Sequence, residues 1–435
     1  MITNQPIAGA MITDLGAAGR VARPEPMLTP DGQPAIVDWS LNQAVRHLNH
    51  GSFGAVPRTA QSAQARLREI MDENPLAWFI GLPERVAAAR CEIAGYLHSD
   101  PAHTALVPNA SAGVTVVYAN LPTTPGMEIV ITDHCYGAVA MGAERLARRR
   151  NCVVRIARIP LEADAATATE LVMAEVTDRT ALIVIDQITS ATAREMPAGA
   201  VALAGSRIGV PVLVDAAHAP GLVASPLEGI DADFWVGNLH KFACAPRGTA
   251  ALVASDSFDQ QLNPLIDSWG APYPFPERFD HQGTVDVTGY LAARTSFDTI
   301  EQRYGWDAAR AYMQCLGDYA ETVVSSAMSE ATGLDARVEV GMPVNALRLI
   351  RLPGLLATSR EDAADLQQFL SVTAQVETSI MSWRGEGFLR LSTHVYNTPE
   401  DYEDFAERVV PIIVTLGRHA RSGDKPYALA SDATA

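Results

Sequence analysis

Val212-Leu-Val-Asp215-Ala-Ala-His218 is the stretch of sequence that decides the fold. It combines a short apolar strand with a carboxylate and an imidazole, and wholly apolar strands are typical of parallel sheets covered by helices. A second apolar run, Phe234-Trp-Val, leads into Gly-Asn-Leu-His-Lys241. Open parallel sheets bind their ligands at the carboxyl ends of the strands. We therefore expect Asp215, His218 and Lys241 to meet at one edge of a sheet.

Strand and helix patterns alternate over much of the chain. Further apolar strand candidates lie at 105–107, 128–132, 153–156, 181–185 and 250–253. Helical patterns accompany them, for example at 60–73, 83–97 and 138–150. This alternation predicts an α/β fold with a large, doubly wound, mostly parallel sheet.

The sequence divides into four parts. Residues 1–45, rich in Gly, Pro and Ala, predict an N-terminal arm, and 46–304 predict the large domain that holds this sheet. From 305 to 420 the pattern predicts a smaller C-terminal α+β domain, and 421–435 a flexible tail. In the small domain we expect helices at 308–331, 360–370 and 399–416 and strands at 346–352 and 388–392.

Charge and composition narrow the class of partner. The chain has 435 residues and a formal net charge of −17 at pH 7. Nucleic acid and anionic membranes bind clustered cations, so we expect neither as a partner. Hydrophobic residues make up 48% and charged residues 19%, which is enough for large packed cores. We expect a soluble protein that acts on a small molecule.

Targeting and redox signals are sparse. No basic segment followed by a compact apolar run marks a secretory signal, and the uncharged stretch 104–127 contains prolines and asparagines that argue against a membrane span. The five cysteines form no CxxC pair and the ten histidines are scattered. We expect reduced thiols, a cytoplasmic location and no metal site.

Lysine is rare in this chain. Only two of the 33 basic residues are lysines, Lys241 and Lys425, and Lys425 lies in the polar tail, where we interpret it as a solvated charge. Arginine cannot form a Schiff base. A lysine kept in the body of the fold is therefore a candidate for covalent chemistry.

Lys241, Asp215 and His218 together predict pyridoxal 5'-phosphate (PLP) as cofactor. A lysine amine condenses with the aldehyde of PLP to form a Schiff base. A carboxylate at the pyridine nitrogen keeps it protonated, so that the ring accepts electrons from the Cα of an amino acid. An imidazole can hydrogen-bond the ring hydroxyl. Taken singly, Asp215 also fits a helix cap and His218 a core histidine, but the three in this order favour the cofactor.

A phosphate site is expected where the strand 105–107 ends. Pro108-Asn-Ala-Ser-Ala-Gly113 follows it and begins a helix. Small residues at a helix N-terminus allow backbone N–H groups to approach a phosphate, and Ser111 adds a hydroxyl. A plain serine N-cap is an equally good reading of this segment. Asn238 and His240, on either side of Leu239, are further candidate donors.

At these residues the chain resembles the class V aminotransferases, which are PLP enzymes of fold type I, and most of all their isopenicillin N epimerase group. The resemblance covers roughly residues 46 to 410. It is carried by Leu48-Asn-His-Gly-Ser-Phe-Gly54, Asp215-Ala-Ala-His-Ala-Pro-Gly221, Gly237-Asn-Leu-His-Lys241, Gln282-Gly-Thr-Val-Asp286 and Arg390-Leu-Ser-Thr-His-Val-Tyr-Asn397.

The resemblance implies roles at matching positions. Lys241 would be the Schiff-base lysine and proton shuttle, Asp215 would face the pyridine nitrogen and His218 the ring hydroxyl. Arg390 would clamp the substrate carboxylate through two hydrogen bonds, although a surface arginine on a strand is its alternative reading. Tyr136 would stack on the ring, with His134 as the alternative.

The remaining expected contacts fall into two groups. His50 and Ser52 are expected in the substrate site. The cofactor contacts are those of Ala110, Ser111, Ala112, Ser190, Asn238 and His240, together with Thr284 from the neighbouring subunit of a homodimer with shared active sites.

Departures from the family pattern bear on the reaction. Cysteine desulfurases carry a mobile cysteine ahead of the clamp arginine, whereas the last cysteine here is Cys315, so desulfuration through a persulfide is disfavoured. Ser190 stands where desulfurases have asparagine and is similar to the epimerase group. Val285 stands where the epimerases tend to have arginine, which argues against their acidic substrate.

The expected function is Cα–H abstraction from an amino acid or amino-acid conjugate through a quinonoid, with epimerisation favoured. C–S lysis or β-elimination on an S-substituted cysteine is the main alternative, followed by transamination and decarboxylation. A non-catalytic partner that keeps the fold is a further alternative, which the intact Lys241 and Asp215 disfavour. The arginine bias and the resemblance suggest specialised metabolism, such as antibiotic biosynthesis.

Overall fold

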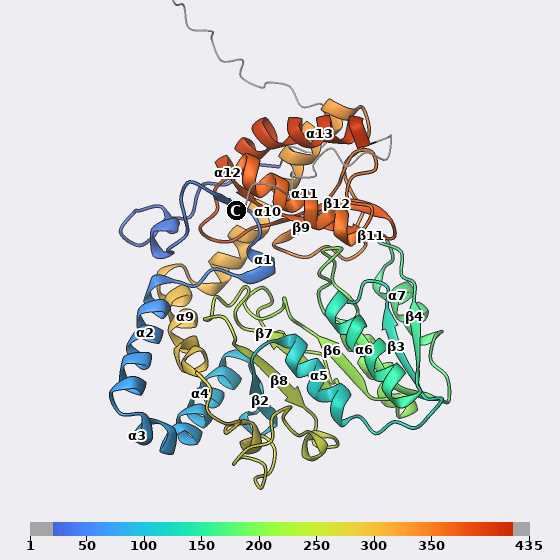
Figure 1. The fold of residues 1–435 in the computed structure, drawn as a ribbon. Coiled ribbons are helices and arrows are strands. Elements are labelled where there is room, and N and C mark those ends of the chain that lie inside the picture. Colours follow the sequence, from blue (N-terminus) through green and yellow to red (C-terminus); the bar gives the residue numbers. More distant parts are fainter. Residues whose placement is uncertain (1–20, 421–435) are drawn as a thin grey trace, which may run out of the picture.

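A seven-stranded sheet forms the centre of the computed structural model, which describes residues 21–420 (Figure 1). Its strand order is β2-β8-β7-β6-β5-β3-β4. The strands from β4 to β7 are parallel, and β8 runs antiparallel to its neighbours β7 and β2. The strands are β2 Thr104–Val107, β3 Glu128–Thr132, β4 Val153–Ala157, β5 Thr180–Asp186, β6 Val212–Asp215, β7 Phe234–Asn238 and β8 Ala250–Ala254. The predicted α/β fold with a mostly parallel sheet is confirmed.

The sheet separates two hydrophobic cores. Along β5, Ile183 and Ile185 pack into one core and Leu182 and Val184 into the other, because successive side chains of a strand point to opposite faces. Helices therefore have to cover both faces, which is why these strands are apolar throughout.

Helices lie on both sides of this sheet (Figure 1). One face is covered by α5 Ala110–Asn120 and α6 Gly137–Arg150. The other is covered by α4 Leu82–Leu97, α7 Ala165–Met173, α8 Ala198–Ile208 and α9 Thr288–Arg303. Next to α9 packs α2 Arg58–Glu73, which α3 Pro75–Ile80 connects to α4.

A second, three-stranded sheet lies beyond the carboxyl ends of the parallel strands (Figure 1). It is antiparallel, in the order β11-β12-β9. Ile350 and Leu389 pack into a separate core, whereas Leu349 and Phe388 join one core of the large sheet. Its elements are β9 Leu347–Arg351, β11 Ser379–Trp383, β12 Glu386–Ser392, α10 Trp306–Thr332, α11 Arg360–Ala374, α12 Pro399–Asp404 and α13 Val410–His419. The small sheet and its helices therefore lie next to the carboxyl ends of the parallel strands of the large sheet.

The C-terminal elements depart from the prediction in two places. The strands β10, Val376–Glu377, and β11 were not predicted. The helix predicted at 399–416 is interrupted by a π-helical turn at Phe405–Val409. Pro411 follows that turn and has no backbone N–H to donate, so a wider turn is a natural way to accommodate it.

Short segments connect the N-terminal part of the chain to the small C-terminal sheet region. β1, Arg46–His47, pairs in parallel with β10, Val376–Glu377, and α1, His50–Phe53, follows it. The expected tail and residues 1–20 of the expected arm lie outside the described residues. Our division at residue 304 falls at the junction of α9 and α10 and stays a prediction. Within the described part, every helix is too short or too polar to cross a bilayer.

Candidate active site

A pocket of about 210 Å³ opens at the carboxyl ends of β5, β6 and β7. Chain direction explains its position, because parallel strands end at the same edge of the sheet. The structure brings ten of the expected site residues to its lining: Ser52, Ala110, Ser111, Tyr136, Ser190, Asp215, His218, Asn238, His240 and Lys241. Phe53, Asn109, Asp186, Ile188 and Ala217 also line it and were not singled out from the sequence.

Lys241 is the amine at the centre of this pocket. Its side chain is buried, and its Nζ lies 3.1 Å from Nε2 of His218. Burial, helped by the positive charge of Arg390, lowers the pKa of Lys241 to about 7. Burial and the nearby Lys241 also lower the pKa of His218 well below its usual value. Near neutral pH, the pocket thus holds an amine that can lose its proton next to a neutral imidazole.

Two carboxyl groups end adjacent strands in the same pocket. Asp186 and Asp215 are paired in register between β5 and β6, and both are 3% exposed. The Oδ1 of Asp215 accepts a hydrogen bond from the Ala217 N–H at 3.1 Å. Burial raises the pKa of both groups, and for Asp186 the charge of Asp215 raises it further.

Asp186 was missed at the sequence level although it carries the same signal as Asp215. It too is a carboxylate directly after an apolar strand, at the end of 181–185. We gave weight to Asp215 because His218 and Lys241 follow it. Asp186 is followed by no such pair.

The N-terminus of α5 forms another wall of the pocket. Asn109 is the N-cap, and its Oδ1 accepts a hydrogen bond from Ala112 N at 2.8 Å. The Ala110 N–H donates to Oδ1 of Asn238 at 2.8 Å. Ala112 is thus engaged in the cap and is not part of the pocket lining, whereas Ser111 borders the pocket.

A close approach between α5 and β7 fixes where that helix begins. A Cβ on Gly113 would lie 2.6 Å from Cγ1 of Val236, which is closer than atoms pack. Only glycine therefore fits at this position without a shift of the helix or of Val236.

Arg390 is not part of the pocket lining, but it contacts two residues that are, Ser52 and Ser190. It comes from β12, is 1% exposed, and donates from Nη1 to the Ser190 carbonyl at 2.6 Å. Its Nη2 donates to Oγ of Ser52 at 2.9 Å and to Oδ1 of Asn49 at 3.3 Å. Its Nε is buried without a hydrogen-bond partner among residues 21–420. All of these acceptors are neutral oxygens, so the guanidinium is oriented but its charge is not balanced by them.

Residues 82–405 match the sequence model of the family described as Aminotransferase class-V. The chain belongs to this family. It is 28% identical over 398 residues to the isopenicillin N epimerase of Streptomyces clavuligerus, covering 86% of this chain and 98% of that protein. It is 26% identical to putative L-cysteine desulfhydrase 1 of Oryza sativa subsp. japonica, over 85% and 83% of the two chains.

A solved structure shares this fold. A mutant of C-DES, described with glycine covalently linked to its PLP cofactor, superimposes with a TM-score of 0.74. It is 16% identical and is covered over 99% of its length, against 87% of this chain. This likeness supports the fold type I architecture predicted from the sequence.

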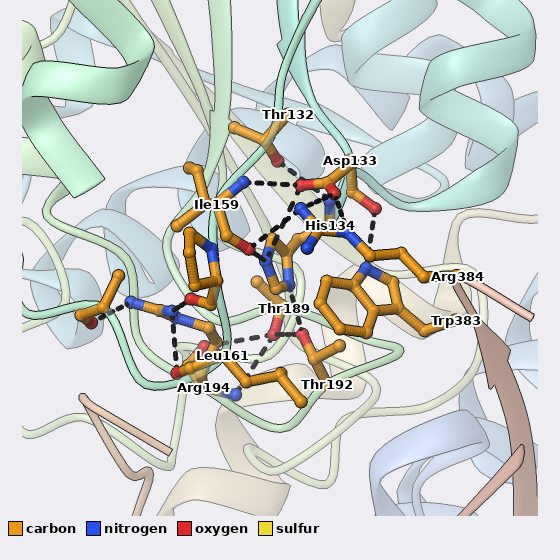
Figure 2. A network of polar contacts seen from close by, with 12 residues as sticks. Thr132, Asp133, His134, Ile159, Leu161, Thr189, Thr192, Arg194, Trp383 and Arg384 are labelled. Atoms are coloured by element: carbon orange, nitrogen blue, oxygen red, sulfur yellow. Dashed lines mark hydrogen bonds and ion pairs between the residues drawn. The ribbon is translucent and has the colours of Figure 1, made fainter. Parts of the chain in front are cut away.

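The structure separates the two residues that compete for the ring-stacking role in this class V chain. Tyr136 lines the pocket and is 44% exposed, so one face of its ring is accessible. His134 is buried and hydrogen-bonded to Oγ1 of Thr192 and to the Ile159 carbonyl, each at 2.7 Å (Figure 2). His134 lies outside the pocket lining, and this arrangement favours Tyr136.

Besides Ala112, His134 and Arg390, two more expected residues lie outside the pocket lining, Thr284 and His50. Thr284 is exposed in the loop before α9, and its expected role in a neighbouring subunit stays a prediction. His50 lies behind Lys241, where its ring nitrogens contact the Lys241 carbonyl and the Tyr396 hydroxyl, both at 3.0 Å. These contacts give His50 a supporting position with respect to the lysine backbone.

His50 also belongs to a cluster that the sequence did not reveal. Its Nε2, the Cys244 Sγ and a ring nitrogen of His394 lie within 4.8 Å of one another, all buried. The two imidazole rings are stacked at 3.9 Å and an interplanar angle of 17°. Lone pairs in nearly parallel rings do not converge on one ion, and both His50 nitrogens are already engaged. We interpret the cluster as packing beneath Lys241.

Proposed function

We propose that this protein is a PLP enzyme that breaks the Cα–H bond of an amino acid, with epimerisation as the favoured outcome. The observation that carries the proposal is the buried Lys241 amine, which lies beside His218 in the same pocket as the Asp215 carboxyl. Family membership supports the cofactor assignment, because PLP is the cofactor of the class V aminotransferases.

The chemistry of the pocket fits PLP. Lys241 supplies an amine for a Schiff base, and Asp215 a buried acid for the pyridine nitrogen. The helix N-terminus at Ala110 and Ser111 supplies the positive end of a dipole for a phosphate. When bound, the cofactor withdraws electrons from the Cα of an amino acid and so makes its proton acidic.

Lys241 would accept the proton taken from Cα, and His218 would position the lysine amine for that step. The amine is the base because burial lowers its pKa to about 7, so a substantial fraction is unprotonated at neutral pH. His218 Nε2, at 3.1 Å, holds the Nζ in place. The Lys241 backbone is held from behind by His50.

Arg390 would bind the substrate carboxylate. Its guanidinium is buried, and Ser190, Ser52 and Asn49 fix its orientation without neutralising it. A buried cation without a balancing anion is costly, and a bidentate carboxylate removes that cost. This arrangement favours α-amino acids over simple amines.

Epimerisation requires that a proton return to the opposite face of Cα. Tyr136 is our candidate for that face, since its hydroxyl-bearing ring lines the pocket and shares it with Lys241. The similarity to an isopenicillin N epimerase over nearly the whole of both chains supports the same outcome.

A C–S lyase is the second candidate. The 26% identity to a putative L-cysteine desulfhydrase supports it. Cys244, the cysteine closest in sequence to Lys241, is buried against His50 and His394 and lies outside the pocket lining, which argues against a persulfide mechanism.

Incubation with a panel of amino acids in heavy water distinguishes these outcomes. Deuterium at Cα with inversion of configuration supports the epimerase, whereas pyruvate and a released thiol identify the lyase. Lys241→Ala is the control, and it should give neither product. A colourless protein that gains no visible absorbance when PLP is added would refute the proposal.

We also propose a homodimer. The surface around Thr284 exposes apolar side chains, with Trp269 81%, Ile266 54% and Val285 41% exposed. Exposed apolar groups gathered near a predicted subunit contact are typical of an interface. Sedimentation equilibrium tests this directly, and a monomer at micromolar concentration would contradict it.

A further inference from the structure

The turn between β11 and β12 contacts the loop that follows β3 through Trp383 and Arg384 (Figure 2). The Arg384 Nε donates to Oδ2 of Asp133 at 2.6 Å, and the Trp383 Nε1 donates to the Asp133 carbonyl at 3.0 Å. Asp133 thus receives a charged and a neutral hydrogen bond from adjacent residues of the small sheet. The contact joins two segments that are 250 positions apart in the sequence.

The loop that receives this contact is firmly held. The Asp133 Oδ1 accepts a hydrogen bond from Ile159 N at 3.0 Å, and both ring nitrogens of His134 are engaged. The His134 ring packs on Trp383 with centroids 4.8 Å apart. The side chain of Asp133 is only 15% exposed. An ion pair within such a network is worth more than an isolated surface pair.

The backbone conformation of the turn indicates that the side chain of Arg384, and not its turn propensity, favours arginine at this position. Arg384 and Gly385 have φ of 50° and 78°, so this hairpin turn requires positive φ at both of its central positions. Asn-Gly is the preferred pair for such turns, and positive φ is unfavourable for arginine. A residue held in an unfavourable conformation points to a constraint beyond the turn itself.

We infer that Arg384, together with Trp383, is a positioning residue for Arg390. The strand β12 runs from the turn to Arg390, which is bound at its own end to the Ser190 carbonyl. The strand is therefore attached to the large sheet domain at two points. The loop that anchors the turn also leads into Tyr136, so one contact sets the guanidinium relative to the tyrosine. The inference rests on the proposed function, in which Arg390 binds the substrate carboxylate.

Arg384→Asn is the decisive variant. Asparagine suits the positive φ, so the turn should form, but it is too short to reach Asp133. In the PLP-loaded protein, we expect faster amide hydrogen exchange over 379–392, measured by mass spectrometry. We also expect the apparent dissociation constant for L-cysteine, or for the amino acid that the panel selects, to rise about three- to tenfold. The cofactor absorption should stay unchanged.

Two controls accompany it. Arg408→Gln breaks the ion pair between Arg408 and Asp404, which lies in the same part of the molecule but outside 379–392, and should change neither readout. Arg384→Lys keeps a positive charge and should restore part of the affinity.

Unchanged exchange over 379–392 in Arg384→Asn would overturn the inference, as would faster exchange with unchanged amino-acid affinity. Failure of the proposed function is recognised by a different result. If Arg390 does not bind the substrate carboxylate, Arg390→Ala will leave the affinity for the amino acid unchanged.

Discussion

Two charged regions meet at the pocket, and they are built in opposite ways. At the strand ends of the large sheet, the Lys241 amine lies in a pocket that also holds the carboxyls of Asp186 and Asp215. On β12, Arg390 is buried as deeply, but its hydrogen-bond acceptors are neutral. The first region can balance its charge internally, whereas the second needs an anion from outside. The difference identifies which region holds the chemistry and which selects the ligand.

Removing the amine tests the first region most severely. Lys241→Ala should abolish turnover and prevent borohydride from attaching the cofactor within residues 21–420, because no other lysine lies there. Peptide mass mapping after reduction measures this. Cofactor attached at another position would place the chemistry elsewhere.

Asp215→Ala should lower kcat on the order of a thousandfold while PLP remains bound. The carboxyl no longer holds the proton of the ring nitrogen, but the phosphate site and Lys241 are untouched. Steady-state kinetics with a parallel absorption spectrum measure both effects. An unchanged rate would remove Asp215 from the ring nitrogen.

Arg390→Ala probes the second region, and its effect should be on binding. We expect KM for an amino acid to rise roughly 10- to 100-fold with a smaller change in kcat, because charge-assisted hydrogen bonds to the carboxylate are lost. Arg351→Ala, another arginine of the small sheet, is the matched control. Equal losses in both variants would mean a general effect on folding.

The pH dependence of cofactor attachment follows from the lowered pKa of Lys241. Burial lowers it from 10.5 to about 7, so the amine is unprotonated above that pH and protonated below it. Attachment of PLP to the apoprotein should therefore slow about tenfold per pH unit below 7 and level off above it. Stopped-flow absorption measures the rate. A plateau reached only near pH 10 would show an ordinary lysine.

The smallest effect is expected at Asp186. Burial and the nearby Asp215 raise the pKa of Asp186, which favours its neutral form. Asp186→Asn copies the neutral acid and should change kcat by less than about threefold. A loss as large as that of Asp215→Ala would show that Asp186 is ionised in the working enzyme.

The meeting of these residues at the strand ends was predictable, because each directly follows or ends a strand that the sequence reveals. Asp215 ends β6 and His218 follows it, Lys241 follows the neighbouring strand β7, and parallel strands end at one edge. The same local rule would have found Asp186. The fold class followed from the apolar strands, whose two-sided burial leaves a clear pattern.

Contacts between distant segments were not predictable in this way. Ser190 and Arg390 are 200 positions apart, and nothing in either neighbourhood reveals that one orients the other. The support of Lys241 by His50 was missed for the same reason. Both depend on how the small sheet and the segment before α2 pack onto the large sheet.

The missing side chain of Gly113 has a consequence for how this protein can change. A side chain there would meet Val236, so that either this valine or α5 would have to shift, and we expect Ala110 and Ser111 to be displaced with the helix. Cofactor retention should therefore depend on a methyl-sized gap in the hydrophobic interior, at a position that never touches the cofactor. Loss of colour on dialysis, rather than loss of fold, is the first symptom to expect of a mutation at that site.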